Sequence, residues 1–150
     1  MKRIFLGFAS ILISAALVAQ NATIVKAEDF VKFKELSYNF GKIKQGKPVT
    51  HDFQFTNISD KAVVVETATP SCGCTTPVWP QAPLAKGKDD KITAGFNALA
   101  QGAFNKSITV KFAGIDAPIE LKISGEVLNA DDYAKYEKEK GKAPKTGSRK

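Results

Sequence analysis

Alternating apolar and polar side chains mark most of this chain as β-strand. The clearest segment is 49–56, in which Val49, His51, Phe53 and Phe55 alternate with polar residues. A period of two residues places one face of a strand in a core and the other in water. Similar segments occupy 31–33, 38–43, 62–69, 91–96, 104–112 and 119–127. Turn-forming residues separate them and no helical period lies between them, so the pattern predicts an antiparallel β-sandwich of about seven strands.

The aromatic residues support this architecture. Seven phenylalanines fall at positions that the alternation turns inward: Phe33, Phe40, Phe53, Phe55, Phe96, Phe104 and Phe112. An aromatic stripe can also line a sugar-binding face, but alternate spacing along strands favours a core. We therefore expect Phe53 and Phe55 to be buried. The single histidine, His51, shares their register, and we expect it at the rim of the sandwich in a structural role.

Residues 1–27 are interpreted as a signal peptide and leader. A short basic stretch precedes an apolar segment, 4–19, that also contains small residues. This pattern is typical of a cleavable signal peptide, with cleavage after Ala19 or Ala27. The apolar segment is shorter than the ~20 residues that a membrane span prefers, and an uncleaved anchor is the alternative. Either way, the remainder is expected in the periplasm or outside the cell, with no transmembrane span after signal cleavage.

The expected sandwich domain covers 28–129, and 130–150 is a charged tail. The tail lacks apolar periodicity, which predicts disorder beyond a short helix near 131–140. Much of the formal net charge of +7 lies in this tail. The tail mixes four acidic residues with its seven basic ones, and the chain is expected to be exported, so we expect no nucleic-acid partner. The tail is interpreted as solubilising, or as weakly adhesive toward an anionic surface.

The motif Ser71-Cys72-Gly73-Cys74-Thr75-Thr76 holds the only two cysteines. A disulfide between them closes almost no loop and removes little entropy from the unfolded chain. It also requires a tight turn at Gly73, because residues two apart on an extended strand hold their Cβ atoms about 6.5–7 Å apart. Three alternatives stay open: a structural turn or buried thiols, a redox pair, and a two-thiolate site for a soft ion such as Cu(I).

A tetrahedral zinc site would need two ligands besides Cys72 and Cys74. The sequence supplies only His51 and carboxylates for them, so we assign no metal and no cofactor. The prolines within 77–83 stiffen this segment, which follows the cysteines, and the segment is expected to present its side chains to solvent. The candidate binding loop comprises Ser71, Gly73, Thr75, Thr76 and Trp79.

Sequence patterns typical of enzymes are absent. There is no Gly-x-Ser-x-Gly, no glycine-rich phosphate loop and no His-Glu-x-x-His. The adjacent carboxylates Asp89 and Asp90 lie in a lysine-rich segment and are interpreted as solvated. We therefore expect a protein that is not an enzyme.

Five short motifs give the chain a resemblance to a known family. They are YNFGKIKQG (38–46), HDFQFTN (51–57), SCGCTTP (71–77), GAFNKSI (102–108) and LKISGEV (121–127). In this order they resemble the bacterial domain-of-unknown-function family 1573, over about residues 30–128. The resemblance implies an Ig-like sandwich and an exported protein of Bacteroidetes-like bacteria. It implies no reaction. Segment 85–90 departs from the Pro-Gly-Glu turn common in the family, and we expect a looser loop there.

Together these observations predict an exported Ig-like binding or scaffold module of the cell envelope that is not an enzyme. The expected partner is a protein or an envelope polymer. The alternative is a thiol-disulfide redox or copper-handling protein that acts through Cys72 and Cys74.

The export signal makes the first prediction. Mature protein recovered from the periplasm or medium is expected to lack residues 1–19 or 1–27, because the apolar segment resembles a cleavable signal. Intact mass spectrometry measures this directly. Recovery of chains that still begin at Met1 would contradict it.

Overall fold

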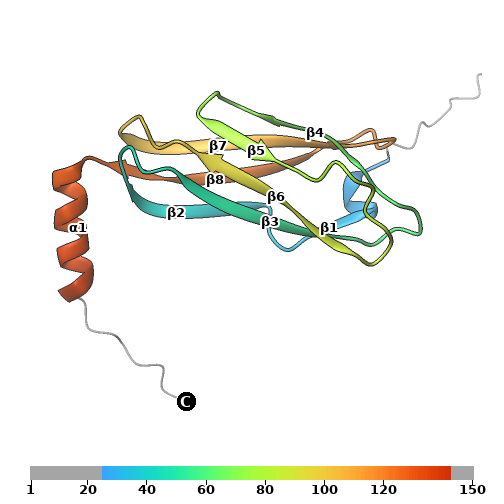
Figure 1. Cartoon of the computed structure of the whole chain (residues 1–150), viewed down its shortest axis with the longest axis horizontal. Coiled ribbons are helices and arrows are strands. Elements are labelled where there is room, and N and C mark those ends of the chain that lie inside the picture. Colours follow the sequence, from blue (N-terminus) through green and yellow to red (C-terminus); the bar gives the residue numbers. More distant parts are fainter. Residues whose placement is uncertain (1–24, 143–150) are drawn as a thin grey trace, which may run out of the picture.

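The computed structural model describes residues 25–142, which form two facing four-stranded sheets with a helix at one end (Figure 1). The elements in chain order are η1 (Ala27–Asp29), β1 (Val31–Phe33), β2 (Ser37–Lys44), β3 (Val49–Asn57), β4 (Val65–Pro70), β5 (Thr75–Val78), β6 (Asp89–Phe96), β7 (Gly102–Phe112), β8 (Ile119–Leu128) and α1 (Ala130–Lys142). The predicted β-sandwich is confirmed.

The strand order is that of an immunoglobulin constant-type domain. One sheet has the order β1-β3-β6-β5 and the other β2-β8-β7-β4. These match the A-B-E-D and G-F-C sheets of that fold, with the first strand divided between them. The division explains why there are eight strands where about seven were expected. It also produces the one parallel pair among the described strands, β2 with β8, in a sandwich predicted to be antiparallel throughout.

The inward register predicted for β3 is confirmed. The side chains of Phe53 and Phe55 are 0% and 2% exposed. Phe96, Phe104 and Phe112 are also buried, whereas Phe33 and Phe40 pack against the core while partly exposed. These last two lie on edge strands, where fewer neighbours cover each side chain.

Aromatic pairs join the two sheets. Phe96 of β6 stacks on Phe104 of β7 with ring centroids 4.0 Å apart. Phe55 of β3 meets the ring of Phe112 on β7 edge to face at 5.8 Å. In antibody domains, strands B and F carry a disulfide that ties the sheets together. Here the corresponding strands, β3 and β7, are in contact through the Phe55–Phe112 pair.

His51 lies at the rim, as its register predicts. Its ring stacks on Tyr38 of β2 with centroids 3.5 Å apart, and its Nε2 lies 2.9 Å from a carboxylate oxygen of Glu35. The side chain is about one-sixth exposed. These contacts link the two sheets and agree with the structural role expected for His51.

A close approach of backbones fixes the path of β2. A Cβ built on Gly125 of β8 would lie 2.8 Å from the carbonyl oxygen of Gly41, so only glycine fits there. Gly41 has a φ of +67° at a shift of register between Asn39 and Lys42. This bulge lets β2 stay parallel to β8 around the Phe104 ring.

Buried Asn57 organises the end of the sandwich where β3 finishes. Its amide nitrogen donates to the carbonyl oxygens of Lys61 and Leu84, at 2.8 Å each. Its backbone donates to the Lys88 carbonyl and accepts from the Gly87 amide. The expectation of a looser loop at 85–90 is therefore wrong, because Asn57 and the positive φ of Gly87 close a tight turn.

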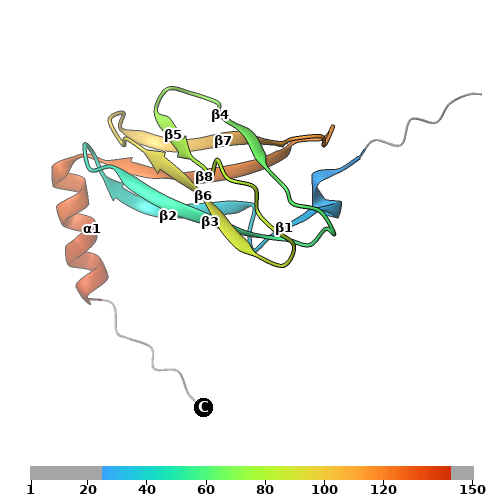
Figure 2. The same cartoon turned by 45° about the vertical axis from the view of Figure 1, so that its right-hand side comes forward.

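The segment after the sandwich is more ordered than the sequence predicted. Asn129 caps α1 by accepting a 2.9 Å hydrogen bond from the amide of Asp132. The helix then continues to Lys142, whereas we expected at most a short helix near 131–140 in a disordered tail. It projects from the end of the sandwich opposite η1 (Figure 1 and Figure 2). No helix within 25–142 is long and apolar enough to cross a membrane. Residues 143–150 and 1–24 lie outside the described residues, and most of the segment 1–27 that we expect to be a signal peptide and leader falls in the latter range.

The aromatic core makes the second prediction. Phe53→Ala should lower the free energy of unfolding by about 3–5 kcal/mol, because it leaves a cavity at a fully buried site. Thr50→Ala, at an exposed position of the same strand, should change it by less than about 0.5 kcal/mol. Chemical denaturation measures both. A loss under ~1 kcal/mol for Phe53→Ala would show that this site repacks freely.

Candidate functional site

The cysteine motif forms the turn by which the chain crosses from one sheet to the other. β4 ends in one sheet at Pro70, and β5 begins in the other at Thr75. Three backbone hydrogen bonds hold the turn: Thr75 to the carbonyl of Cys72 (3.2 Å), Ser71 to that of Ser107 (2.8 Å), and Asn97 to that of Cys74 (3.1 Å). The crossover is thus tied to β6 and β7 as well as to itself.

Cys72 and Cys74 are joined in a disulfide, with their Cα atoms 5.3 Å apart. The tight turn that this bond requires is present at Gly73. That glycine does not adopt a positive φ, and a Cβ built on it would meet no atom within 4 Å. Its backbone freedom is therefore not what the turn depends on. Within residues 25–142, no group of three or more His, Cys, Asp or Glu side chains could hold a metal ion.

The residues of the candidate binding loop differ in their exposure to solvent. Thr75 is 3% exposed, and its hydroxyl lies 3.6 Å from the sulfur of Cys72. Trp79 is half-buried against the core, and its indole nitrogen finds no hydrogen-bond partner among the described residues. Ser71, Gly73 and Thr76 remain exposed. Ligand binding by this loop stays a prediction, with fewer side chains presented than expected.

The outer face beside the crossover is polar and paired. The side chain of Ser71 accepts a 3.0 Å hydrogen bond from the amide of Ser107. On the neighbouring strand β8, two side-chain hydrogen bonds hold the pKa of the Glu120 carboxyl below its usual value. The larger effect comes from Lys122 and the smaller from Ser107. The Ser71–Ser107 hydrogen bond fastens the turn to its sheet from outside.

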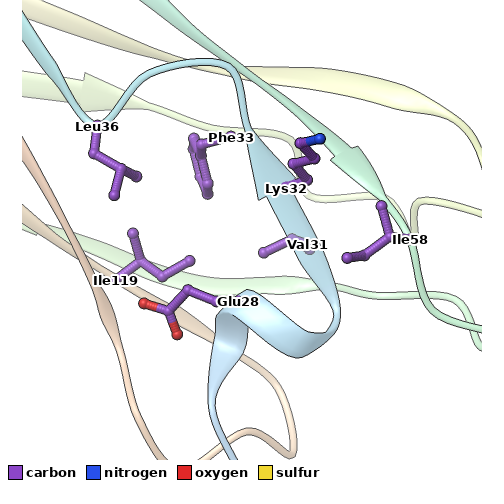
Figure 3. Close-up of a pocket in the computed structure, with 7 residues that line it drawn as sticks. All are labelled: Glu28, Val31, Lys32, Phe33, Leu36, Ile58 and Ile119. Atoms are coloured by element: carbon purple, nitrogen blue, oxygen red, sulfur yellow. The ribbon is translucent and has the colours of Figure 1, made fainter.

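An apolar groove at the opposite edge was not predicted from the sequence. We call the strand-switch groove the hollow of about 240 Å³ where the chain passes from β1 to β2. Figure 3 shows the side chains around it: Val31, Phe33, Leu36, Ile58 and Ile119, with Glu28 and Lys32 as the charged members. Leu36 and Ile58 are 45% and 49% exposed, although both are large and apolar.

The division of the first strand creates this groove. β1 pairs only with β3, and β2 begins its pairing with β8 at Ser37 opposite Lys122. The start of β8, from Ile119 to Leu121, therefore has no β2 residue beside it. The side of the sandwich is left open between the free edge of β1 and this part of β8. One signal of the groove is visible in the sequence: Ile58, an apolar side chain within a turn of polar residues.

The sequence of the sandwich matches a known protein family. A family model matches residues 31–127, which is nearly the whole sandwich. The chain belongs to that family, described as "Protein of unknown function (DUF1573)". No curated protein matches the sequence. The family resemblance is confirmed, and the DUF1573 description itself carries no activity.

Solved structures share the fold of this DUF1573 domain. The PapD-like domain 7 of human CEP192 is 12% identical, with 81% of this chain and 99% of that one covered and a TM-score of 0.57. A protein of unknown function from Porphyromonas gingivalis W83 is 11% identical, covering 65% and 46%, at a TM-score of 0.56. The Vibrio cholerae VesB protease is 17% identical at 0.50, and the match spans 67% of this chain but 33% of the protease. At such low identities these likenesses show the fold alone.

The disulfide makes the third prediction. The double variant Cys72→Ser/Cys74→Ser should still unfold cooperatively, with a loss of less than about 2 kcal/mol, because the bond closes a ring of only three residues. A thermal melt beside wild type measures this. Loss of the cooperative transition would show that the sulfurs are essential packing elements.

Proposed function

We propose that this protein is an exported, non-enzymatic binding or scaffold module of the cell envelope, and that it holds an extended protein segment in the strand-switch groove. The observation that carries the proposal is the groove itself, with five apolar side chains around a hollow beside an unpaired strand edge. Export rests on the apolar segment at 4–19, and the non-enzymatic role on the absence of catalytic motifs in the sequence.

An extended protein segment suits this groove better than a compact ligand. Within the described chain, β1 has a strand partner on one side only, so its other edge offers backbone donors and acceptors. A segment laid along such an edge adds a strand, and every second side chain then points to the same face. Alternate apolar side chains of the segment would reach Leu36, Ile58 and Ile119.

The charges at the groove support a protein partner as well. Glu28 and Lys32 carry opposite charges and lie among apolar side chains. A segment with apolar residues at alternate positions, flanked by one acidic and one basic residue, matches both the surface and its charges. A uniformly charged envelope polymer would meet one of these two groups unfavourably.

The fourth prediction compares two synthetic decapeptides with immobilised wild-type domain. One has apolar residues at alternate positions between flanking Asp and Lys residues, and the other has the same composition with its apolar residues adjacent. We expect the alternating peptide to bind more tightly. Leu36→Lys should weaken its binding about tenfold or more, because a buried leucine contributes roughly 1.5–3 kcal/mol.

Leu99→Lys is the matched control, since Leu99 is also exposed, at 65%, but lies in the β6–β7 loop away from the groove. It should leave the affinity within about twofold. Equal binding of the two peptides, or equal effects of the two lysine variants, would refute the assignment of the groove.

A further inference from the structure

The disulfide does little that the rest of the sandwich does not already do. It joins residues two apart, whereas the sheets are held together by the Phe55–Phe112 and Phe96–Phe104 pairs. The crossover turn has its own hydrogen bonds to Ser107 and Asn97. Opening the bond between the sulfurs would therefore leave the strands and the turn in place.

Two groups bear on a thiolate at Cys72: a hydroxyl in contact with its sulfur, and a lysine on the strand that pairs with β4. The Thr75 hydroxyl, almost fully buried, has the Cys72 sulfur as its partner at 3.6 Å. When that sulfur becomes a thiolate, the hydroxyl can donate a hydrogen bond to it. Hydrogen bonds to an ionised acceptor are stronger than those between neutral groups.

The second group is Lys106 of β7. Its position belongs to the inward row between Phe104 and Ile108, and it is half-buried. β4 ends opposite Ile108, so Lys106 lies one inward position beyond that end, level with the crossover turn. Lys106 makes no ion pair with any residue in the described part of the chain. The register of β4 with β7, continued by the Ser71–Ser107 bond, sets Cys72 opposite Lys106, and a lysine near a cysteine stabilises its thiolate.

From these observations we propose that Cys72–Cys74 is a thiol–disulfide exchange site that oxidises one dithiol per disulfide, a stoichiometric step that adds to the non-enzymatic binding role proposed above. A thiolate of the dithiol attacks the Cys74 sulfur, the Cys72–Cys74 bond breaks, and Cys72 leaves as a thiolate supported by Thr75. The second thiol of the substrate loses its proton and attacks its own mixed-disulfide sulfur, which releases Cys74. Two electrons and two protons pass to the cysteine pair, and the substrate leaves as a disulfide.

Reduction of the native protein by dithiothreitol tests this, with quenching by iodoacetamide and counting of alkylated cysteines by mass spectrometry. Wild type is expected to be reduced fully while its melt stays cooperative. Thr75→Val should slow the reduction about tenfold, because the leaving thiolate loses its hydrogen bond. Thr69→Val is the matched control, since Thr69 is an exposed threonine of β4 outside the candidate binding loop, and it should leave the rate unchanged.

A second pair of variants covers the case in which Thr75→Val fails to fold. Lys106→Met should also slow the reduction, whereas Lys111→Met, on the outward face of the same strand, should not. In Cys72→Ser, a one-cysteine peptide activated as its mixed disulfide with 2-thiopyridine should form a mixed disulfide with Cys74 and release 2-thiopyridone. This mixed disulfide should persist, because neither the peptide nor the variant carries a second thiol to resolve it. Reduction only after denaturation, or equal rates within each matched pair, would overturn the proposal and leave the peptide binding of the groove unaffected.

Discussion

Contact between aromatic rings of facing sheets is the interaction on which the rest of this structure depends. Phe96 and Phe104 stack at 4.0 Å, Phe55 meets Phe112, and Tyr38 stacks on His51 at the rim. Each pair takes one ring from each sheet, and aromatic pairs contribute beyond the area that they bury. Because these contacts fix the spacing of the sheets along their length, the cysteines are free of the stapling role that they have in antibody domains.

The sequence was enough to predict the interior of the sandwich, but not which strands lie at its edges. Alternation along β3 was enough to place Phe53 and Phe55 inside. The period of two residues reports which face of a strand is buried. It carries no information on which strand lies at an edge, since that depends on pairing between distant segments.

The candidate sites show the same limit. The spacing of Cys72 and Cys74 was visible, but their place at a sheet-to-sheet crossover required the topology. Trp79 was expected to be presented by its prolines, yet it packs on the core, because an apolar ring beside a sandwich gains more by burial than by exposure. The strand-switch groove was missed because Ile58 and Ile119 are 61 positions apart in the chain and meet only after folding.

The two proposed sites arise from one topological feature. The chain changes sheets at both lateral edges of the sandwich, from β1 to β2 on one side and from β4 to β5 on the other. At the second edge, the crossover turn is closed by a disulfide and hydrogen-bonded to both sheets. This edge is therefore covered, and the group that distinguishes it is the disulfide. At the first edge, three residues span the change with one backbone hydrogen bond to each sheet, at Lys34 and at Leu36. No disulfide closes this edge, and apolar side chains from both sheets stay open to solvent. The same kind of crossing thus yields a disulfide-closed turn at one edge and an open apolar groove at the other.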